Sequence, residues 1–149
     1  MGEAFSHVDT AGRVRMVDVG AKPESRRRAV ARARLRLSPG TAGRLRDLPK
    51  GDALATAELA GVMAAKRTSE LIPLCHQLPL SVVRVNAEVV GDGVEITAAA
   101  ETVAQTGVEM EALVAASVAA LTVYDMVKAV DKAMVVEEVR LVEKTKEPA

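Results

Sequence analysis

The chain has 149 residues, 49% of them hydrophobic and 27% charged, and its twenty basic residues are balanced by twenty acidic ones. This length and composition fit one globular domain, residues 1–149. A neutral chain with no Trp, one Tyr and one Phe has neither the positive charge nor the aromatic surface that binding to nucleic acid needs, so we expect no nucleic-acid partner. A lone cysteine and two distant histidines predict neither an internal disulfide nor a bound metal, and the absence of a membrane-length apolar run or a signal-peptide pattern predicts a cytoplasmic protein without a membrane partner.

The N-terminal part of the chain shows little regular pattern. Met1 to Gly12 has no periodicity, which predicts a flexible arm, and the weak alternation of Arg13 to Gly20 predicts one short strand. Ala21 to Arg28 contains Pro23 and Ser25, which are typical of a loop, and ends in three consecutive arginines. These arginines form either a solvated face or an anion-binding edge, because guanidinium groups pair well with phosphate.

Regular elements begin at Ala29. From Ala29 to Leu37 arginines alternate with apolar residues, the pattern of a half-buried strand. Ser38-Pro39 predicts the start of a brief helix that ends before Pro49. A second helix is predicted from Ala53 to about Ser69, with Asp52 as its N-cap residue.

The segment from Leu71 to Leu80 is apolar but carries Pro73 and Pro79, so it can be neither a regular helix nor a central strand. We expect a rigid, buried loop here. His76 lies in this loop next to Cys75 and is either a histidine of the core or a ligand to a substrate.

A hairpin and a closing strand complete the predicted sheet. Val82 to Val90 alternates, Gly91-Asp92-Gly93 turns the chain, and the alternation resumes at Val94. Towards the C-terminus, Met134 to Glu143 predicts a strand rich in Val, and Lys144 to Ala149 a polar tail.

The longest apolar segment, Val108 to about Val130, predicts a helix that is apolar nearly all round and therefore buried. Asp125 and Lys128 lie three positions apart on one stripe of this helix, and Glu111 lies at the edge of that stripe, about 21 Å away along the axis. The Asp125 and Lys128 pair is either an ion pair at the helix end or a proton-transfer pair. Because a helix without a polar face must be covered, we also expect a homo-oligomer.

Together these elements predict an α+β fold. A mostly antiparallel sheet carries the helices on one face, and the order of strands and helices is that of a ferredoxin-like sandwich. No internal repeat or linker indicates a second domain.

Several motifs stand in an order that is typical of one family. They are Met16 to Lys22, Lys50-Gly51-Asp52, Ala64 to Thr68, Leu71 to His76, Thr106 to Leu113, and Ala115 to Met126 continuing through Lys128 to Val130. With these motifs, the chain from Phe5 to Lys144 resembles the cyclic pyranopterin monophosphate synthases, the molybdenum cofactor biosynthesis protein C family.

The resemblance implies a lyase that converts (8S)-3',8-cyclo-7,8-dihydroguanosine 5'-triphosphate, the product of a radical enzyme, to cyclic pyranopterin monophosphate with release of pyrophosphate. It also implies a homohexamer, built as a trimer of dimers, with the site at a dimer interface. No cofactor is implied, although Mg²⁺ can accompany the substrate triphosphate.

The resemblance also assigns roles to residues. It implies that Asp125 is the catalytic acid and that Lys50 and Lys128 are the catalytic lysines. The substrate-binding residues that it implies are Leu74, Cys75, His76, Met110 and Glu111, with Arg27, Lys22, Lys66, Arg67 and Lys144 as basic residues for the phosphates. The chain departs from the family at Gln77, where Pro is usual, at Gln105, where Lys is frequent, and in its shortened tail.

Two other classes of protein remain as alternatives. One is a non-catalytic ferredoxin-like oligomer that binds a nucleotide or regulates in response to it. The other is a thiol enzyme that uses Cys75 with His76, although residues adjacent in an extended chain point apart and no third orienting group is apparent.

Overall fold

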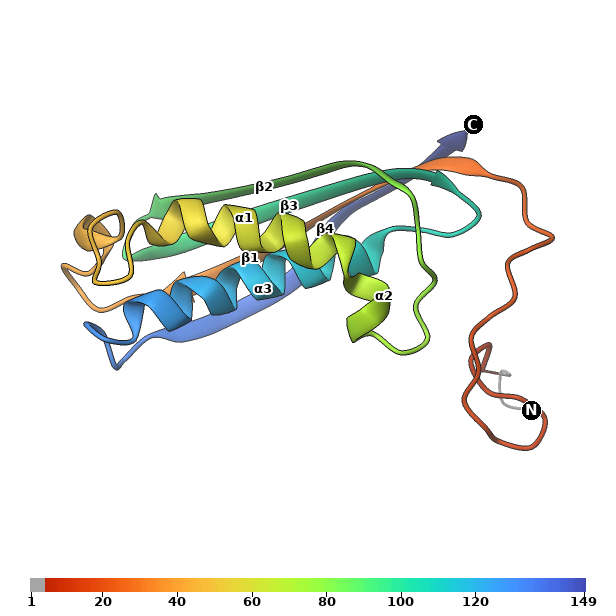
Figure 1. The fold of residues 1–149 in the computed structure, drawn as a ribbon, viewed down its shortest axis with the longest axis horizontal. Coiled ribbons are helices and arrows are strands. Elements are labelled where there is room, and N and C mark those ends of the chain that lie inside the picture. The colour runs from red at the N-terminus through yellow and green to blue at the C-terminus, as the bar shows by residue number, and fades with distance from the viewer. Residues whose placement is uncertain (1–4) are drawn as a thin grey trace.

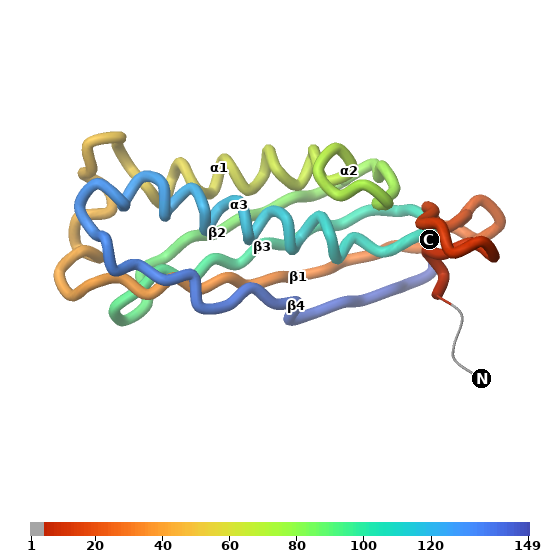
Figure 2. The backbone as a smooth tube through the Cα atoms, turned by 90° about the horizontal axis from the view of Figure 1, so that it is seen from below, coloured from red at the N-terminus to blue at the C-terminus, as the bar shows by residue number. Residues whose placement is uncertain are grey.

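The computed structural model describes residues 5–149. The first four residues of the predicted flexible arm, which runs from Met1 to Gly12, therefore lie outside the described residues. Four antiparallel strands form one sheet in the order β2-β3-β1-β4. The long helices α1 and α3 lie side by side over one face of the sheet, with α1 on the β2 side and α3 on the β4 side (Figures 1 and 2). The elements are β1 (Ser25–Arg36), the 3-10 helix η1 (Ala42–Arg44), α1 (Ala53–Lys66), α2 (Thr68–Leu71), β2 (Leu80–Val90), β3 (Gly93–Ala104), α3 (Glu109–Val127) and β4 (Val135–Pro148). The predicted ferredoxin-like α+β fold is confirmed.

β1 lies in the middle of the sheet, between β3 and β4, and its two faces differ. Small apolar residues on one face are buried in the core with the helices: Ala29, Ala31, Ala33 and Leu35. The arginines at alternate positions lie on the other face, where nearby acids pair with them: Arg28 with Glu101 and Glu143, Arg32 with Glu95, Arg34 with Asp92, and Arg36 with Glu137. The period-2 pattern therefore identified both faces of this strand.

β1 begins at Ser25 rather than at Ala29. The predicted loop from Ala21 to Arg28 is therefore four residues too long at its C-terminal end. Residues 25–28 pair with β3 on one side and with β4 on the other. Because backbone groups bonded on both sides are well satisfied, this pairing outweighs the loop tendency of the local sequence. Of the three consecutive arginines, Arg27 shares the helix-covered face of Ala29. β4 also extends further than predicted, since Lys144 to Pro148 continues the strand instead of forming a tail.

α3 is the core helix of the fold. It ends at Val127 rather than near Val130. A closing turn follows, in which the backbone N–H of Asp131 donates to the carbonyl oxygen of Val127. Its inner residues are at most 4% exposed: Ala112, Ala115, Ala119, Val123 and Met126. Its outer side exposes Met110, Leu121 and Tyr124, so the prediction of burial all round is wrong for the single chain. By length and composition α3 is the one helix in residues 5–149 that could cross a membrane, and here it packs on α1 and the sheet.

Three local predictions are corrected. Arg13 to Gly20 forms no strand, because only Val14 makes a bridge, with Val8, and no strand of the sheet lies beside it. The brief helix predicted after Ser38 is reduced to the single turn η1. The connector between α2 and β2 is half exposed rather than buried, because it passes around the end of the molecule from the helix layer to an edge strand (Figure 1). The predicted hairpin is confirmed as β2 and β3.

α1 begins at Ala53 with Asp52 as its N-cap residue, as predicted, but it ends at Lys66 rather than near Ser69, and the separate helix α2 begins at Thr68. The Asp52 side chain accepts hydrogen bonds from the backbone N–H groups of Leu54 (3.0 Å) and Ala55 (3.1 Å), which would otherwise lack partners at the helix start. Midway along α1, Gly61 is buried where the helix meets α3 and β2. A Cβ atom there would lie 3.0 Å from the carbonyl oxygen of Ala115 and 3.0 Å from both methyl groups of Val85. The absence of a side chain therefore permits the close approach of the two helices.

Substitution of Gly61 by alanine tests this contact. Alanine favours a helix over glycine by about 1 kcal/mol, but overpacking a core costs about 1–3 kcal/mol. We expect Gly61→Ala to lower the free energy of unfolding, measured by urea denaturation. Gly43→Ala is the control, because nothing lies within 4 Å of a Cβ atom at that position. A more stable Gly61→Ala protein would contradict the close approach.

Candidate active site

Three of the predicted residues form a cluster at the C-terminal end of α3. The ammonium group of Lys50 lies 2.7 Å from Oδ2 of Asp125, and that of Lys128 lies 2.9 Å from Oδ1. We call Lys50, Asp125 and Lys128 the Asp125 cluster. Its members are separated by up to 78 positions in the chain, so the fold, and no local motif, brings Lys50 to the other two.

The backbone around the Asp125 cluster is well defined. Asp125 lies in the last turn of α3 and Lys128 directly follows that helix. Lys50 is carried by a tight turn in which Leu48 and Gly51 bond each other, and Gly51 has a φ of 111°, a conformation that favours glycine. Leu48 is buried and anchors this turn to the core. Each lysine therefore extends from a fixed point.

The charges of the Asp125 cluster follow from its contacts. Hydrogen bonds from Lys50 and then from Lys128 lower the pKa of Asp125 to about 2, and the bond to Asp125 raises the pKa of Lys128. All three side chains are about half exposed in the single chain, so the predicted buried stripe is corrected. The cluster holds a carboxylate between two cations. An arrangement of this kind can orient ammonium groups towards a phosphate and can exchange protons through the lysines.

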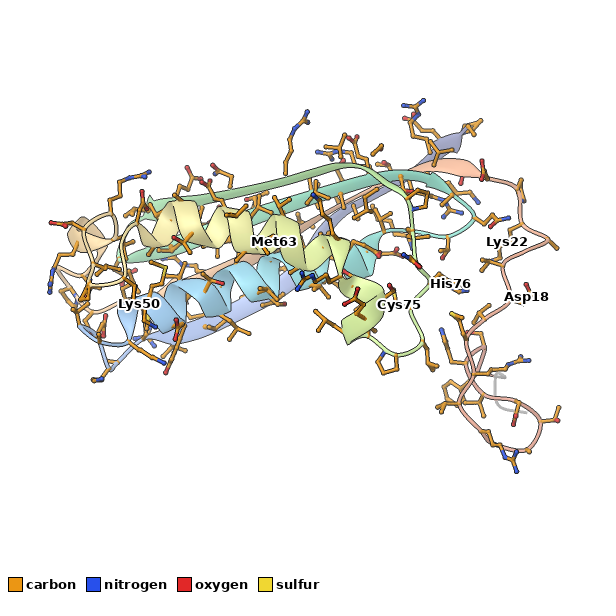
Figure 3. The ribbon with its side chains drawn as sticks, in the orientation of Figure 1. Asp18, Lys22, Lys50, Met63, Cys75 and His76 are labelled. Atoms are coloured by element: carbon orange, nitrogen blue, oxygen red, sulfur yellow. The ribbon has the colours of Figure 1, made fainter. Side chains whose placement is uncertain are left out.

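A second group of predicted residues lies at the opposite end of α3, as the separation of Lys50 from Cys75 and His76 in Figure 3 shows. A cavity of about 380 Å³ is lined there by His7, Ile72, Leu74, Cys75, His76, Leu78, Thr106, Gly107, Glu109 and Met110. We call it the Cys75 cavity. The Nε2 atom of His76 donates a hydrogen bond to the carbonyl oxygen of Val17 (2.5 Å), which ties the N-terminal segment to the rim.

Glu111 is buried beside the Cys75 cavity. It is 3% exposed, its Oε1 atom has no hydrogen-bond partner among the described residues, and its Oε2 atom lies 4.0 Å from the thiol of Cys75. Loss of solvent raises the pKa of Glu111 to about 7. Burial, followed by the charges of Glu111 and Glu109, raises the pKa of the Cys75 thiol. A thiol that resists ionisation is a poor nucleophile, which disfavours the thiol enzyme.

Basic side chains lie around the same end of α3. Lys144 of β4 forms an ion pair of 2.6 Å with Glu109. Burial raises the pKa of Glu109. The hydrogen bond from Lys144 and the charges of Lys144 and Arg27 have a larger, opposite effect, so the pKa of Glu109 lies below its ordinary value. Arg27 donates from Nε to the hydroxyl of Ser25. Glu109 was not among the predicted site residues, and no local pattern in the sequence indicated its ion pair with Lys144, because the two residues belong to different elements.

The remaining predicted basic residues are less closely placed. Lys66 lines a separate hollow of about 460 Å³ with residues of α1 and β2. Arg67 lies exposed between α1 and α2. Lys22 lies in the N-terminal segment beyond the sheet, on the far side of His76 from the body of the molecule (Figure 3). The structure thus brings Arg27 and Lys144 near the Cys75 cavity and leaves these three outside it.

Two of the three departures from the family pattern, Gln77 and Gln105, lie near this end. Gln105 donates from its side-chain amide to the carbonyl oxygen of Gly20 (3.4 Å). Gln105 and Gln77 line a smaller cavity of about 150 Å³ next to His76. In residues 5–149 no three His, Cys, Asp or Glu side chains are grouped so that they could hold a metal ion.

Comparisons with known proteins agree on one family. Residues 16–147 match the MoaC family. A protein of Novosphingobium aromaticivorans named cyclic pyranopterin monophosphate synthase is 55% identical over 142 residues, which cover 94% of this chain and 90% of that protein. Proteins with the same name from a Roseiflexus species and from Streptomyces coelicolor are 56% identical (95% of this chain and 92% of that protein) and 54% identical (96% and 85%).

The burial of Glu111 predicts a dependence of stability on pH. In the unfolded chain the carboxyl group ionises near 4.5, whereas in the folded chain it ionises only near 7. Its contribution to stability is therefore complete below pH 4.5 and is lost as the pH rises to about 7, because the folded protein then holds a buried charge. We expect Glu111→Gln to raise the free energy of unfolding at about pH 8 by up to about 3 kcal/mol and to change it little at about pH 4.

Glu109→Gln is the control for this measurement. The pKa of Glu109 is lowered, so its carboxylate stabilises the fold above its ordinary pKa, and that contribution is lost only as the pH falls. At about pH 8 the Glu109→Gln protein should therefore unfold more easily than the unmodified protein. Equal effects of the two substitutions in urea titrations would contradict the different environments of the two acids.

Proposed function

The chain belongs to the MoaC family, and we propose that it is the lyase of molybdenum cofactor biosynthesis that converts (8S)-3',8-cyclo-7,8-dihydroguanosine 5'-triphosphate to cyclic pyranopterin monophosphate and pyrophosphate. The observation that carries this proposal is the identity of more than half of the residues over nearly the whole chain, from relatives named for that synthase activity. The contacts of Asp125 with two lysines support it, because they supply the groups that the reaction needs.

The overall conversion sets the chemical requirements. A triphosphate becomes a cyclic monophosphate, so a substrate hydroxyl loses its proton as its oxygen bonds to the α-phosphorus, and pyrophosphate leaves with the electrons of the broken P–O bond. Lys50 and Lys128 stabilise the charge on the phosphates and exchange protons with the substrate. Asp125 holds the two ammonium groups in place as their counter-ion.

The Cys75 cavity binds the rest of the substrate. His76 and Glu111 contact the polar edge of the purine-derived ring or the ribose, alongside Leu74, Cys75 and Met110. Arg27 and Lys144, with Lys22, Lys66 and Arg67 from neighbouring segments, hold the triphosphate, since guanidinium and ammonium groups bind phosphate oxygens well. Mg²⁺ bound to the triphosphate is compatible with this set, because it needs no ligand cage from the protein.

We further propose that two copies of the chain complete each site. Asp125 and Glu111 are fourteen positions apart on one helix, which places them about 21 Å from each other at about 1.5 Å per residue. The Asp125 cluster and the Cys75 cavity of one chain therefore lie too far apart to act on the same reacting centre. A two-fold axis near the middle of α3 would bring the cluster of one copy to the cavity of the other.

The outer face of the helix layer is the surface that fits this contact. Leu59 and Met63 of α1 and Leu121 of α3 are exposed there by 62%, 47% and 60%. The open face of the sheet instead carries the paired arginines and acids. The sheet edges are protected, since Glu58 bonds the backbone N–H of Ala87 on β2 and β4 has register shifts and ends at Pro148. The dimer is proposed to assemble further into a hexamer of three dimers in the cytoplasm, with residues 1–149 acting as one domain.

Asp125→Asn tests the proposed chemistry. The amide keeps the shape of the carboxylate but is a neutral partner for the two lysines, so pyrophosphate release from the cyclised substrate should fall by roughly 100-fold or more. The melting temperature should change little, because the group is half exposed. Asp92→Asn is the control, since Asp92 is also an exposed ion-pair partner but lies on the open face with Arg34. An Asp125→Asn protein with more than about a tenth of normal turnover would return the cluster to a structural role.

Mixed assemblies test the shared site. A Lys128→Ala chain and a His76→Ala chain should each be inactive alone. When the two are co-expressed in equal amounts, about half of the dimers contain one chain of each kind, and each of these has one intact site, so about a quarter of normal activity should return. Lys128→Ala mixed with Asp125→Asn is the control, because every site would then lack one member of the cluster. If the first mixture recovers no more activity than the control, each site lies within a single chain.

A further inference from the structure

Asp131 is a buried carboxylate that the proposed reaction does not use. It lies just beyond α3 and is 4% exposed. Its Oδ2 atom accepts a hydrogen bond from the backbone N–H of Ser38 (2.7 Å), and its Oδ1 atom accepts from the hydroxyl of Ser38 (2.8 Å) and from the backbone N–H of Ala133 (3.0 Å). Asp131 thus links two segments that are far apart in the sequence.

The position is unfavourable for a negative charge on two counts. Burial removes the carboxylate from water, and the C-terminal end of a helix has a partial negative charge of its own. The pKa of Asp131 is nevertheless lowered to about 2, first by the hydrogen bond from the Ser38 backbone and, after the opposing effect of burial, by the bonds from Ala133 and from the Ser38 hydroxyl. The hydrogen bonds to Asp131 therefore outweigh the effect of burial and keep its carboxylate ionised. They also hold the carboxylate against Ser38 and Ala133.

The two linked segments are those that carry the lysines of the Asp125 cluster. Lys128 lies three positions before Asp131, in the turn that closes α3. Ser38 begins the segment that leads through η1 to the turn of Lys50, and Leu45 and Leu48 fix the middle of that segment in the core. The hydrogen bonds from Ser38 to Asp131 join these two segments at this end of the molecule.

We infer that Asp131 is a positioning residue for the Asp125 cluster. By joining Ser38 to the turn after α3, it sets the spacing of Lys50 and Lys128 on either side of the Asp125 carboxylate. It touches neither the substrate nor the lysines in this role. The effect on turnover rests on the proposed function, whereas the effect on the cluster itself does not.

The hydrogen bonds allow a graded series of substitutions. In Asp131→Asn, the amide oxygen can still accept from the Ser38 hydroxyl and from Ala133, but the amide nitrogen then faces the Ser38 N–H, and two donors meet. Ser38→Ala removes only the hydroxyl bond and leaves the backbone bond in place. Ile96→Val is the control for stability, because Ile96 is fully buried in the core and the substitution typically costs about 0.5–1.5 kcal/mol without touching either segment.

Two measurements test the inference. The first is steady-state pyrophosphate release, in which Asp131→Asn should lower kcat by roughly 10- to 100-fold, because a displacement near 1 Å has an effect of this size. The KM should stay within about twofold, because none of the ten proposed substrate-binding residues belongs to either of the segments that Asp131 joins. Ser38→Ala should lie between Asp131→Asn and the unmodified protein, and Ile96→Val should keep its kcat.

The second measurement needs no turnover. In protein labelled with ¹³C at aspartate carboxyl groups, the pKa of Asp125, near 2 in the unmodified protein, should rise in Asp131→Asn as the two lysines move away. Ser38→Ala gives the same readout if Asp131→Asn does not fold. An unchanged Asp125 titration, or a kcat loss shared with Ile96→Val, would overturn the positioning role. An unmodified protein without pyrophosphate release would instead refute the proposed function and leave the titration as the test of Asp131.

Discussion

The contact between an alanine-rich helix and an alanine-rich sheet surface is the constraint on which the rest of the structure depends. Ala29, Ala31 and Ala33 of β1 lie in the same core as the small residues of α3. Small side chains on both surfaces let the helix lie close to the sheet, and Gly61 lets α1 lie close to α3. The result is a closely packed layer with the Asp125 cluster at one end of α3 and the Cys75 cavity at the other. Such a core leaves little free volume, so a single added methyl group is enough to disturb it.

Glu111 and Asp125 show how the surroundings at each end of α3 determine the pKa of an acid. Glu111, in the first turn, is buried and has no cationic partner within residues 5–149, whereas Lys144 pairs with the neighbouring Glu109. Asp125, in the last turn, is open to solvent and has two lysines. The helix dipole alone would predict the reverse preference, with negative charge favoured at the N-terminal end. Direct partners and burial therefore outweigh the dipole at both ends of this helix.

Periodicity in the sequence was enough to predict the sheet, the long helices and the ferredoxin-like order, because each strand and helix has one face in the core. Local chemistry was enough for the Asp52 cap and for the turn at Gly91. Local pattern failed where a neighbouring strand decides the outcome, as at Ser25 to Arg28, or where an alternating segment has no strand beside it, as at Arg13 to Gly20. The ion pair of Lys50 with Asp125 and the bonds of Ser38 to Asp131 join distant parts of the chain, so only the family resemblance pointed to the first and nothing in the sequence pointed to the second.

The scarcity of aromatic residues has an experimental consequence. The chain has no Trp and a single Tyr, and that residue, Tyr124, directly precedes Asp125 and is 39% exposed on the outer face of the helix layer. Tyrosine emission and the near-ultraviolet circular dichroism of the tyrosine band therefore arise from one ring beside the Asp125 cluster. Such optical signals report on this end of the molecule and on whatever covers the helix layer there. Events in the Cys75 cavity, at the other end of α3, would need an introduced label.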